Sequence, residues 1–276
     1  MRTLLPPDRP AIMGILNVTP DSFSDGGRYK ARDAAMRQAM IMIDQGADII
    51  DIGGESTRPG ADSVSETEEL DRVIPVIEAL RAESATPVSI DTMKPAVARA
   101  AIGAGANIWN DVTALRFADD SPAAAAELGV PIVLMHMRGD PKTMQADLAP
   151  YDDVVADVAA FLTGRAGAAE AAGVSRENIW LDPGIGFGKS LEDNLALTRG
   201  LRQVSELGLP VLYGASRKRF IALLDPAADS AADRLGGSVA AAIAAAEGGA
   251  RVLRVHDVAE TAQALKVWRA IKDGKT

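Results

Sequence analysis

The chain has 276 residues, 47% of them hydrophobic, so it is long enough to bury a sizeable core. Its 29 basic and 38 acidic residues give a net charge of -9, which argues against nucleic acid or an anionic membrane as a partner. Cysteine is absent and histidine occurs twice, which excludes disulfides and thiolate chemistry and disfavours a zinc site with several histidines. Any metal ion is therefore expected to be bound by oxygen atoms.

The first ten residues include two prolines and lack a long apolar core, so they do not form a signal peptide. No later segment reaches the ~20 apolar residues that a membrane span needs. These two observations predict a cytoplasmic protein.

Short apolar segments alternate with helical segments along the whole chain. The first of them, residues 11–16, has the unbroken apolar pattern of a strand buried on both faces. Seven more strands are predicted at residues 48–52, 88–90, 107–109, 130–135, 180–181, 211–213 and 251–255. Helices are predicted at residues 31–45, 66–83, 95–103, 121–128, 152–172, 191–206 and 233–247, and from the last strand to about residue 271. Residues 140–151 form a longer polar connection.

Eight strand and helix units, with about 35 residues in each, are typical of a (β/α)8 barrel. A doubly wound open sheet is the main alternative, but it binds its ligand at one switch point, so its edge strands need no site residues. Here polar residues lie at or just beyond the ends of seven predicted strands: Asn17, Asp51, Asp91, Asn110, Asp182, Lys218 and His256. We therefore predict one α/β domain, a single (β/α)8 TIM barrel of residues 1–276.

Two polar loops follow the first two predicted strands. The first, residues 17–27, ends in two glycines and has Phe23 as its one large apolar residue, which fits either a mobile loop over a ligand or an ordinary surface turn. The second, residues 53–61, is rich in glycine and holds Arg58 between a threonine and a proline. An anion or an aromatic ring would bind there.

The first set of site candidates combines hydrogen-bond acceptors with one donor: Asp91, Asn110, Asp182 and Lys218. These residues fit a flat heterocycle, because adjacent N–H groups of an aminopyrimidine give one carboxylate two hydrogen bonds. A single aspartate can instead cap a helix or brace a turn, and this interpretation is favoured for Asp51 and Asp111. Met135 either fills the core or lies beside the ligand.

The second set is Asn17, Arg254 and His256, on strands that are neighbours in a closed barrel. The Arg254 guanidinium can make two charge-assisted hydrogen bonds to a phosphate, and His256 can donate one more. Asn17 offers one oxygen ligand to a Mg²⁺ ion whose other ligands are waters and phosphate oxygens. The alternative is a solvated arginine and a capping histidine. Ser216 is predicted to open the helix after the seventh strand, where free N–H groups bind an anion.

The chain resembles the dihydropteroate synthases from end to end. Seven motifs carry the resemblance: Asn17-Val-Thr-Pro-Asp-Ser-Phe-Ser-Asp25, Glu55-Ser-Thr-Arg-Pro-Gly60, Asp91-Thr92, Asn110-Asp111, Asp182-Pro-Gly-Ile-Gly-Phe187, Ser216-Arg-Lys218 and Arg254-Val-His256. The resemblance implies a transferase of folate biosynthesis, of the kind that sulfonamides target. Such an enzyme joins p-aminobenzoate to 6-hydroxymethyl-7,8-dihydropterin diphosphate and releases pyrophosphate.

The resemblance also implies roles for the residues at matching positions. The implied pterin-binding residues are Asp91, Asn110, Met135, Asp182, Phe187 and Lys218. The implied diphosphate-binding residues are Asn17, which also binds Mg²⁺, with Thr57, Arg58, Arg254 and His256. The implied p-aminobenzoate-binding residues are Phe23, Pro59, Phe187 and Ser216. The implied catalytic residues are Asn17, Asp91, Asp182, Lys218, Arg254 and His256.

Two other functions remain open from the sequence. One is a pterin-binding methyltransferase that acts with a corrinoid protein, and the other is a non-catalytic paralogue of the synthase. The complete first two loops and the Arg254-Val-His256 motif count against the methyltransferase, because it has no diphosphate to bind. The intact loops count against the paralogue as well. A barrel isomerase or aldolase is disfavoured, since neither a Schiff-base lysine nor a glutamate base is evident.

A homodimer is expected from the alanine-rich helix at residues 233–247, which offers a smooth face for close packing, and the resemblance implies the same.

Overall fold

The computed structural model describes residues 4–18, 27–56, 62–139, 144, 148 and 150–274, with the backbone alone for residues 27–31. Eight parallel strands form one sheet in the order β6-β5-β4-β3-β2-β1-β8-β7. The strands are β1 (Ala11–Asn17), β2 (Ile49–Gly53), β3 (Val88–Asp91), β4 (Ile108–Asp111), β5 (Ile132–Met135), β6 (Ile179–Asp182), β7 (Leu212–Tyr213) and β8 (Val252–Val255). A parallel bridge between Leu181 and Val211 joins β6 to β7 and closes the ring. The predicted (β/α)8 barrel is confirmed, and the open sheet is wrong.

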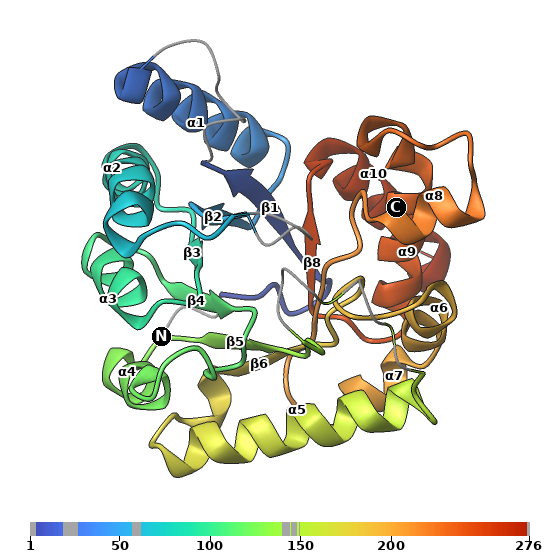
Figure 1. Cartoon of the computed structure of the whole chain (residues 1–276). Coiled ribbons are helices and arrows are strands. Elements are labelled where there is room, and N and C mark those ends of the chain that lie inside the picture. The colour runs from blue at the N-terminus through green and yellow to red at the C-terminus, as the bar shows by residue number, and fades with distance from the viewer. Residues whose placement is uncertain are drawn as a thin grey trace.

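Helices surround the strands (Figure 1). They are α1 (Gly27–Asp44), α2 (Glu66–Glu83), α3 (Pro95–Gly103), α4 (Ser121–Leu128), α5 (Val154–Ala171), α6 (Leu191–Arg199), α7 (Leu201–Ser205), α8 (Arg219–Leu224), α9 (Leu235–Glu247) and α10 (Val258–Asp273). Short 3-10 turns precede β6 at Arg176–Asn178 and α9 at Ala231–Arg234. None of the helices in the described part of the chain is long and apolar enough to cross a membrane.

Three predicted elements differ from the structure. The helix predicted at residues 191–206 is divided at Gly200, where a side-chain Cβ would lie 2.8 Å from Cγ2 of Val155 on α5. Helix α8, which was predicted to open at Ser216, begins only at Arg219, and α9 begins at Leu235 because the preceding turn is 3-10. Most of the predicted connection at 140–151 lies outside the described residues.

The core has two layers because successive residues of each strand face opposite sides. The larger layer packs the outer faces of the strands against the helices, with residues such as Ile90, Leu134 and Val255. The smaller layer comes from the alternate positions of seven strands and therefore fills the barrel: Ala11, Met13, Ile49, Ile108, Val133, Trp180, Leu212 and Val252. Because Leu4 and Leu5 pack against this interior layer, the chain before β1 covers the end of the barrel opposite the polar strand ends.

Ile108→Ala is expected to lower the free energy of unfolding by about 2–5 kcal/mol, because it opens a cavity in the interior layer. Ile108 is fully buried, whereas Ile271 on α10 is 79% exposed. The matched control Ile271→Ala should change stability by no more than about 0.5 kcal/mol. Urea denaturation followed by circular dichroism measures both, and equal effects of the two variants would contradict the interior packing.

Candidate active site

A buried ion-pair network lies at the carboxyl ends of the strands. Arg254 on β8 donates from Nε to Oδ2 of Asp51 on β2 and from a terminal nitrogen to Oδ2 of Asp91 on β3, both at 2.6 Å. Asn110 on β4 donates to the same Asp51 oxygen at 3.3 Å. Four strands therefore contribute to one network.

Burial raises the pKa of Asp91, and the positive charge of Arg254 opposes this shift. Burial alone would lower the pKa of Arg254, but the two carboxylates outweigh it and raise the pKa. Arg254 therefore stays charged.

This network corrects the sequence interpretation of Asp51 and adds partners for Arg254. Asp51 does not brace a turn, since it lies fully buried on β2 against Arg254. Arg254 lies on the strand next to β1, as predicted. Its side chain also pairs with Asp51 and Asp91, which the sequence analysis did not group with it.

Asp111 behaves as the sequence predicted. Its carboxylate accepts hydrogen bonds from the backbone N–H groups of Thr113 and Leu115, at 2.8 and 2.6 Å, and from the Thr113 hydroxyl at 2.7 Å. These bonds hold a turn in which Ala114 and Leu115 have positive φ angles of 53° and 60°. The interpretation of Asp111 as a turn residue is confirmed.

Asp182 and Lys218 meet on the other side of the barrel mouth. Asp182 ends β6, lies 5% exposed, and accepts from the backbone N–H of Gly184 at 2.7 Å. Burial raises its pKa, and the nearby Lys218 opposes the shift. The Lys218 ammonium donates to the carbonyl of Ile185 and lies 4.5 Å from the centroid of the Phe187 ring. Burial lowers the pKa of Lys218 to about 8.

The apolar wall of this site is a small cluster separate from the two core layers. Met135, at the end of β5, is 3% exposed and packs in this cluster with Val112, Met137 and Met144, and Phe187 packs against it. This apolar wall lies beside the polar groups of Asp182 and Lys218, so a flat ring could pack against the one and bond to the others. Small-molecule sites are usually built in this way.

His256 and Ser216 form a third group of contacts. The Ser216 hydroxyl accepts from the His256 backbone N–H at 3.1 Å and lies 3.0 Å from the ring Nδ1. Ser216 does not open a helix, because Arg217 has a φ of 58° and α8 begins only at Arg219. Arg217 instead pairs with Asp257, at 3.0 Å from its Nε. The predicted helix N-terminus at Ser216 is wrong.

Asn17 ends β1 and is partly buried, with Gly53 as its partner on β2. Four other predicted site residues lie outside the described residues: Phe23, Thr57, Arg58 and Pro59.

Sequence reasoning missed a second buried ion pair near the second loop. Lys94 is 8% exposed and donates to Glu55 and, at 2.5 Å, to Glu69 of α2. Glu55 also accepts from the backbone N–H of Val64 at 3.3 Å, so it joins residues on both sides of the loop. The sequence gives no signal for Lys94, because it reads as an ordinary lysine before the proline that begins α3.

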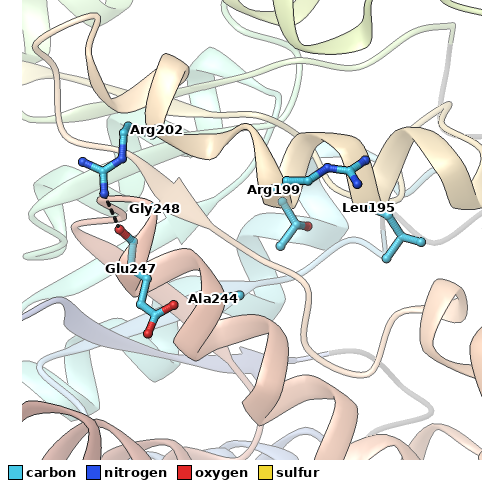
Figure 2. A pocket seen from close by; sticks show the side chains of 7 residues that line it. Leu195, Arg199, Arg202, Ala244, Glu247 and Gly248 are labelled. Atoms are coloured by element: carbon cyan, nitrogen blue, oxygen red, sulfur yellow. Dashed lines mark hydrogen bonds between the residues drawn. The ribbon is translucent and has the colours of Figure 1, made fainter. Parts of the chain in front are cut away.

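Among the described residues, two of the open grooves lie on the outer helices, and neither of these is lined by a site candidate. A groove of about 400 Å³ lies between α6, α7 and α9, where Arg202 donates to the Glu247 carbonyl at 3.3 Å (Figure 2). A groove of about 640 Å³ lies between α1 and α2 and includes Met36, Met40 and Ala79. The convergence of buried polar groups, rather than groove size, therefore identifies the candidate site.

The comparison with known proteins shows the family of the chain. The pterin binding enzyme family matches residues 13–256, which include the network and the Asp182 loop. The chain belongs to this family. It is 48% identical over 262 residues to the dihydropteroate synthase of Haemophilus influenzae, covering 95% of this chain and 94% of that protein. It is also 48% identical over 273 residues to the dihydropteroate synthase of Escherichia coli K12, covering 99% and 95%.

Solved structures agree as well. The Xanthomonas albilineans dihydropteroate synthase with 4-aminobenzoic acid has a TM-score of 0.90 and 53% identity, covering 96% of this chain and 94% of that chain. The same enzyme in complex with 7,8-dihydropteroate has a TM-score of 0.86 and 49% identity, covering 98% and 95%. The resemblance to the dihydropteroate synthases is therefore confirmed over nearly the full length of the chain.

Gly184→Ala is expected to weaken pterin binding at least tenfold in this pterin-binding family member. Gly184 has a φ of 67°, and a Cβ there would lie 1.9 Å from the His136 carbonyl oxygen, so the loop after Asp182 must move. Gly208→Ala is the matched control, because Gly208 has a φ of 78° but nothing within 4 Å of its Cβ. Calorimetry with a pterin ligand measures both variants, and similar losses in the two would show that backbone strain alone is responsible.

Proposed function

We propose that the chain condenses p-aminobenzoate with 6-hydroxymethyl-7,8-dihydropterin diphosphate to give 7,8-dihydropteroate and pyrophosphate. One observation carries the proposal: buried Asp91 and Asp182 end β3 and β6, and buried Asn110 is the last residue but one of β4, with Lys218 beside them at the same barrel mouth. These groups complement a pterin, whose amino, ring N–H and carbonyl groups need acceptors and donors at fixed spacing. The single barrel domain is the unit that we expect to carry out the reaction.

Pterin recognition is assigned to the carboxylate oxygens that the protein leaves available. Oδ1 of Asp182 is bonded to Gly184, and Oδ2 of Asp91 to Arg254. We assign the second oxygen of each carboxylate to ligand N–H groups, because a charged acceptor in a buried site makes strong hydrogen bonds. Lys218 then donates to the pterin, and Met135 and Phe187 lie along the ring.

The chemical step needs no side-chain nucleophile. The bond between the pterin methylene carbon and the diphosphate oxygen breaks, and the electron pair leaves with pyrophosphate. The amine nitrogen of p-aminobenzoate forms the new bond to the methylene carbon and releases a proton to solvent. The chain's contribution is electrostatic: we assign Arg254 and His256 to the leaving diphosphate, with Thr57 and Arg58 from the second loop. Phe23, Pro59, Phe187 and Ser216 are assigned to p-aminobenzoate.

The donor set fits a Mg²⁺ ion that arrives with the substrate. Among the described residues, no three His, Asp or Glu side chains are grouped to hold a metal ion. Asn17 offers one amide oxygen at the end of β1, which suits Mg²⁺ because this ion keeps water and phosphate oxygens as ligands. When bound, Mg²⁺ neutralises charge that develops on the leaving diphosphate.

The two alternative functions predict other results. A corrinoid-dependent methyltransferase would bind a methylated pterin without any effect of pyrophosphate, and a paralogue would bind pterin without turnover. The identity of 48% to two dihydropteroate synthases over at least 95% of this chain favours the synthase.

The decisive experiment is turnover with the two named substrates, followed as dihydropteroate formation. Asp182→Asn should weaken pterin binding at least tenfold, because losing a hydrogen bond to a charged group costs about 1.5–3 kcal/mol. The amide keeps an oxygen for the Gly184 N–H, so the loop is preserved. Asp33→Asn, on the exposed face of α1, is the control and should bind pterin as the wild type does. Normal pterin affinity in Asp182→Asn would refute its role.

Removal of Mg²⁺ by a chelator is expected to reduce turnover at least a hundredfold and to leave the affinity for a pterin without diphosphate within twofold. The reason is that only the diphosphate completes the metal's ligands around Asn17. Readdition of Mg²⁺ should restore activity, and Asn17→Ala should need a higher Mg²⁺ concentration. Tight Mg²⁺ binding to the substrate-free protein, measured by calorimetry, would contradict a shared site.

We further propose a cytoplasmic homodimer that uses α9, whose alanine and glycine residues allow close approach of a second copy. Analytical ultracentrifugation at micromolar concentration should give the mass of two chains, and the mass of one chain would refute the dimer.

A further inference from the structure

The loop between β6 and α6 contains three glycines whose backbone φ angles are positive. Gly184, Gly186 and Gly188 have φ angles of 67°, 82° and 64°. A Cβ on Gly184 would lie 1.9 Å from the carbonyl oxygen of His136, and one on Gly188 would lie 2.6 Å from that of Arg138. The backbone of the loop therefore rests directly on the segment that follows β5.

Lys189 ends this loop, and its side chain turns back beneath it. The residue is 3% exposed, and its ammonium lies 2.8 Å from the Gly184 carbonyl, 3.1 Å from that of Phe187 and 2.9 Å from Nδ1 of His136. The His136 carbonyl lies farther from the ammonium, at 3.4 Å. An ammonium has three donors, and the three shorter contacts are enough to use all of them. Burial lowers the pKa of His136 to about 3, so its ring is neutral and its Nδ1 accepts. Lys189 thus ties the loop to the segment that follows β5.

Asn194 on α6 holds the middle of the loop from the other side. It is 3% exposed, accepts from the Gly186 N–H at 2.6 Å and donates to the Ser190 carbonyl at 2.6 Å. Lys218 holds the Ile185 carbonyl, and Asp182 the Gly184 N–H. Side chains therefore fix the backbone groups of the loop one by one, which is how a short irregular segment is held in a single conformation.

The charge of Lys189 also reaches the site itself. Its positive charge lowers the pKa of Asp182, although burial is the larger effect and raises it. Asp182 in turn favours the charged form of Lys189, whose pKa burial lowers to about 7. The other charged groups that act on Lys189 are Lys218, Asp193 and Arg138, and its contact His136 is neutral.

We propose that Lys189, with Asn194, is a positioning residue for pterin recognition: it fixes the loop so that Asp182, Phe187 and Lys218 keep the spacing that the ring requires. This inference rests on the proposed function, because it takes the pterin to bind at Asp182. The ammonium does not touch the substrate, and it acts through the loop backbone and through the ionisation of Asp182.

The test compares Lys189→Met, Asn194→Ala and a matched control, Asn178→Ala. Asn178 is also a buried asparagine that holds a loop, since it donates to the Gly129 carbonyl at 3.0 Å, but it lies before β6 at the opposite end of the barrel. Lys189→Met is expected to raise the KM for pterin diphosphate at least tenfold, and Asn194→Ala about threefold. The KM for p-aminobenzoate at saturating pterin should stay within twofold. Asn178→Ala should lower the Tm and leave both KM values within twofold.

A second readout separates positioning from stability. Loss of the ammonium raises the pKa of Asp182, so the acidic limb of pterin binding against pH should move to higher pH in Lys189→Met and stay in place in Asn178→Ala. Folded Lys189→Met with a wild-type KM for pterin diphosphate and an unshifted limb overturns the proposal. If Lys189→Met does not fold, the KM ratio in Asn194→Ala decides in the same way. If the wild type shows no turnover, the synthase function is refuted but the positioning role is not. In that case calorimetry compares the affinities of the same variants for free 6-hydroxymethylpterin.

Discussion

The burial of charge at one end of the barrel is the constraint on which the site depends. A buried charge without a partner is expensive, so each ionised group there must be placed against an opposite charge or several dipoles. Arg254 meets this requirement by spanning from β8 to Asp51 on β2 and Asp91 on β3. The sheet order β3-β2-β1-β8 places β8 two strands from β2 and three from β3, so the long Arg254 side chain must cross the barrel mouth to reach both carboxylates. The inward curvature of the sheet makes this charge pairing possible.

The fold was predictable because strands buried on both faces leave a simple trace in the sequence. Residues 11–16 and 130–135 are continuous apolar runs, and a polar residue, Asn17 or His136, follows each run at its carboxyl end. The boundaries that were missed depend on contacts between distant residues. The break at Gly200 results from the approach of Val155 on another helix, which no local pattern reports. Helix α8 has only six residues, too few to show a periodicity.

The site was predictable where position on a strand decides it and unpredictable where the path of a side chain decides it. Asp91, Asn110 and Asp182 follow from strand ends alone, whereas Asp51 shares that position and was interpreted as a brace. Its partner Arg254 is long enough to reach past the neighbouring strand, so the sequence grouped the arginine with Asn17 instead. Lys189 looks like a surface lysine before a helix cap. Its burial follows from the glycine turns that fold the loop back over it.

The balance of charge explains why a pterin diphosphate would need more than this network. Three carboxylates, Asp51, Asp91 and Asp182, stand against three cations, Arg254, Lys189 and Lys218, so their charges cancel. A neutral pterin ring can replace water among them without leaving an unpaired charge. A diphosphate adds negative charge that these paired cations cannot fully neutralise. We therefore expect the additional positive charge to come from Mg²⁺ at Asn17 and from donors outside the network, which would make diphosphate binding depend on the metal far more than pterin binding does.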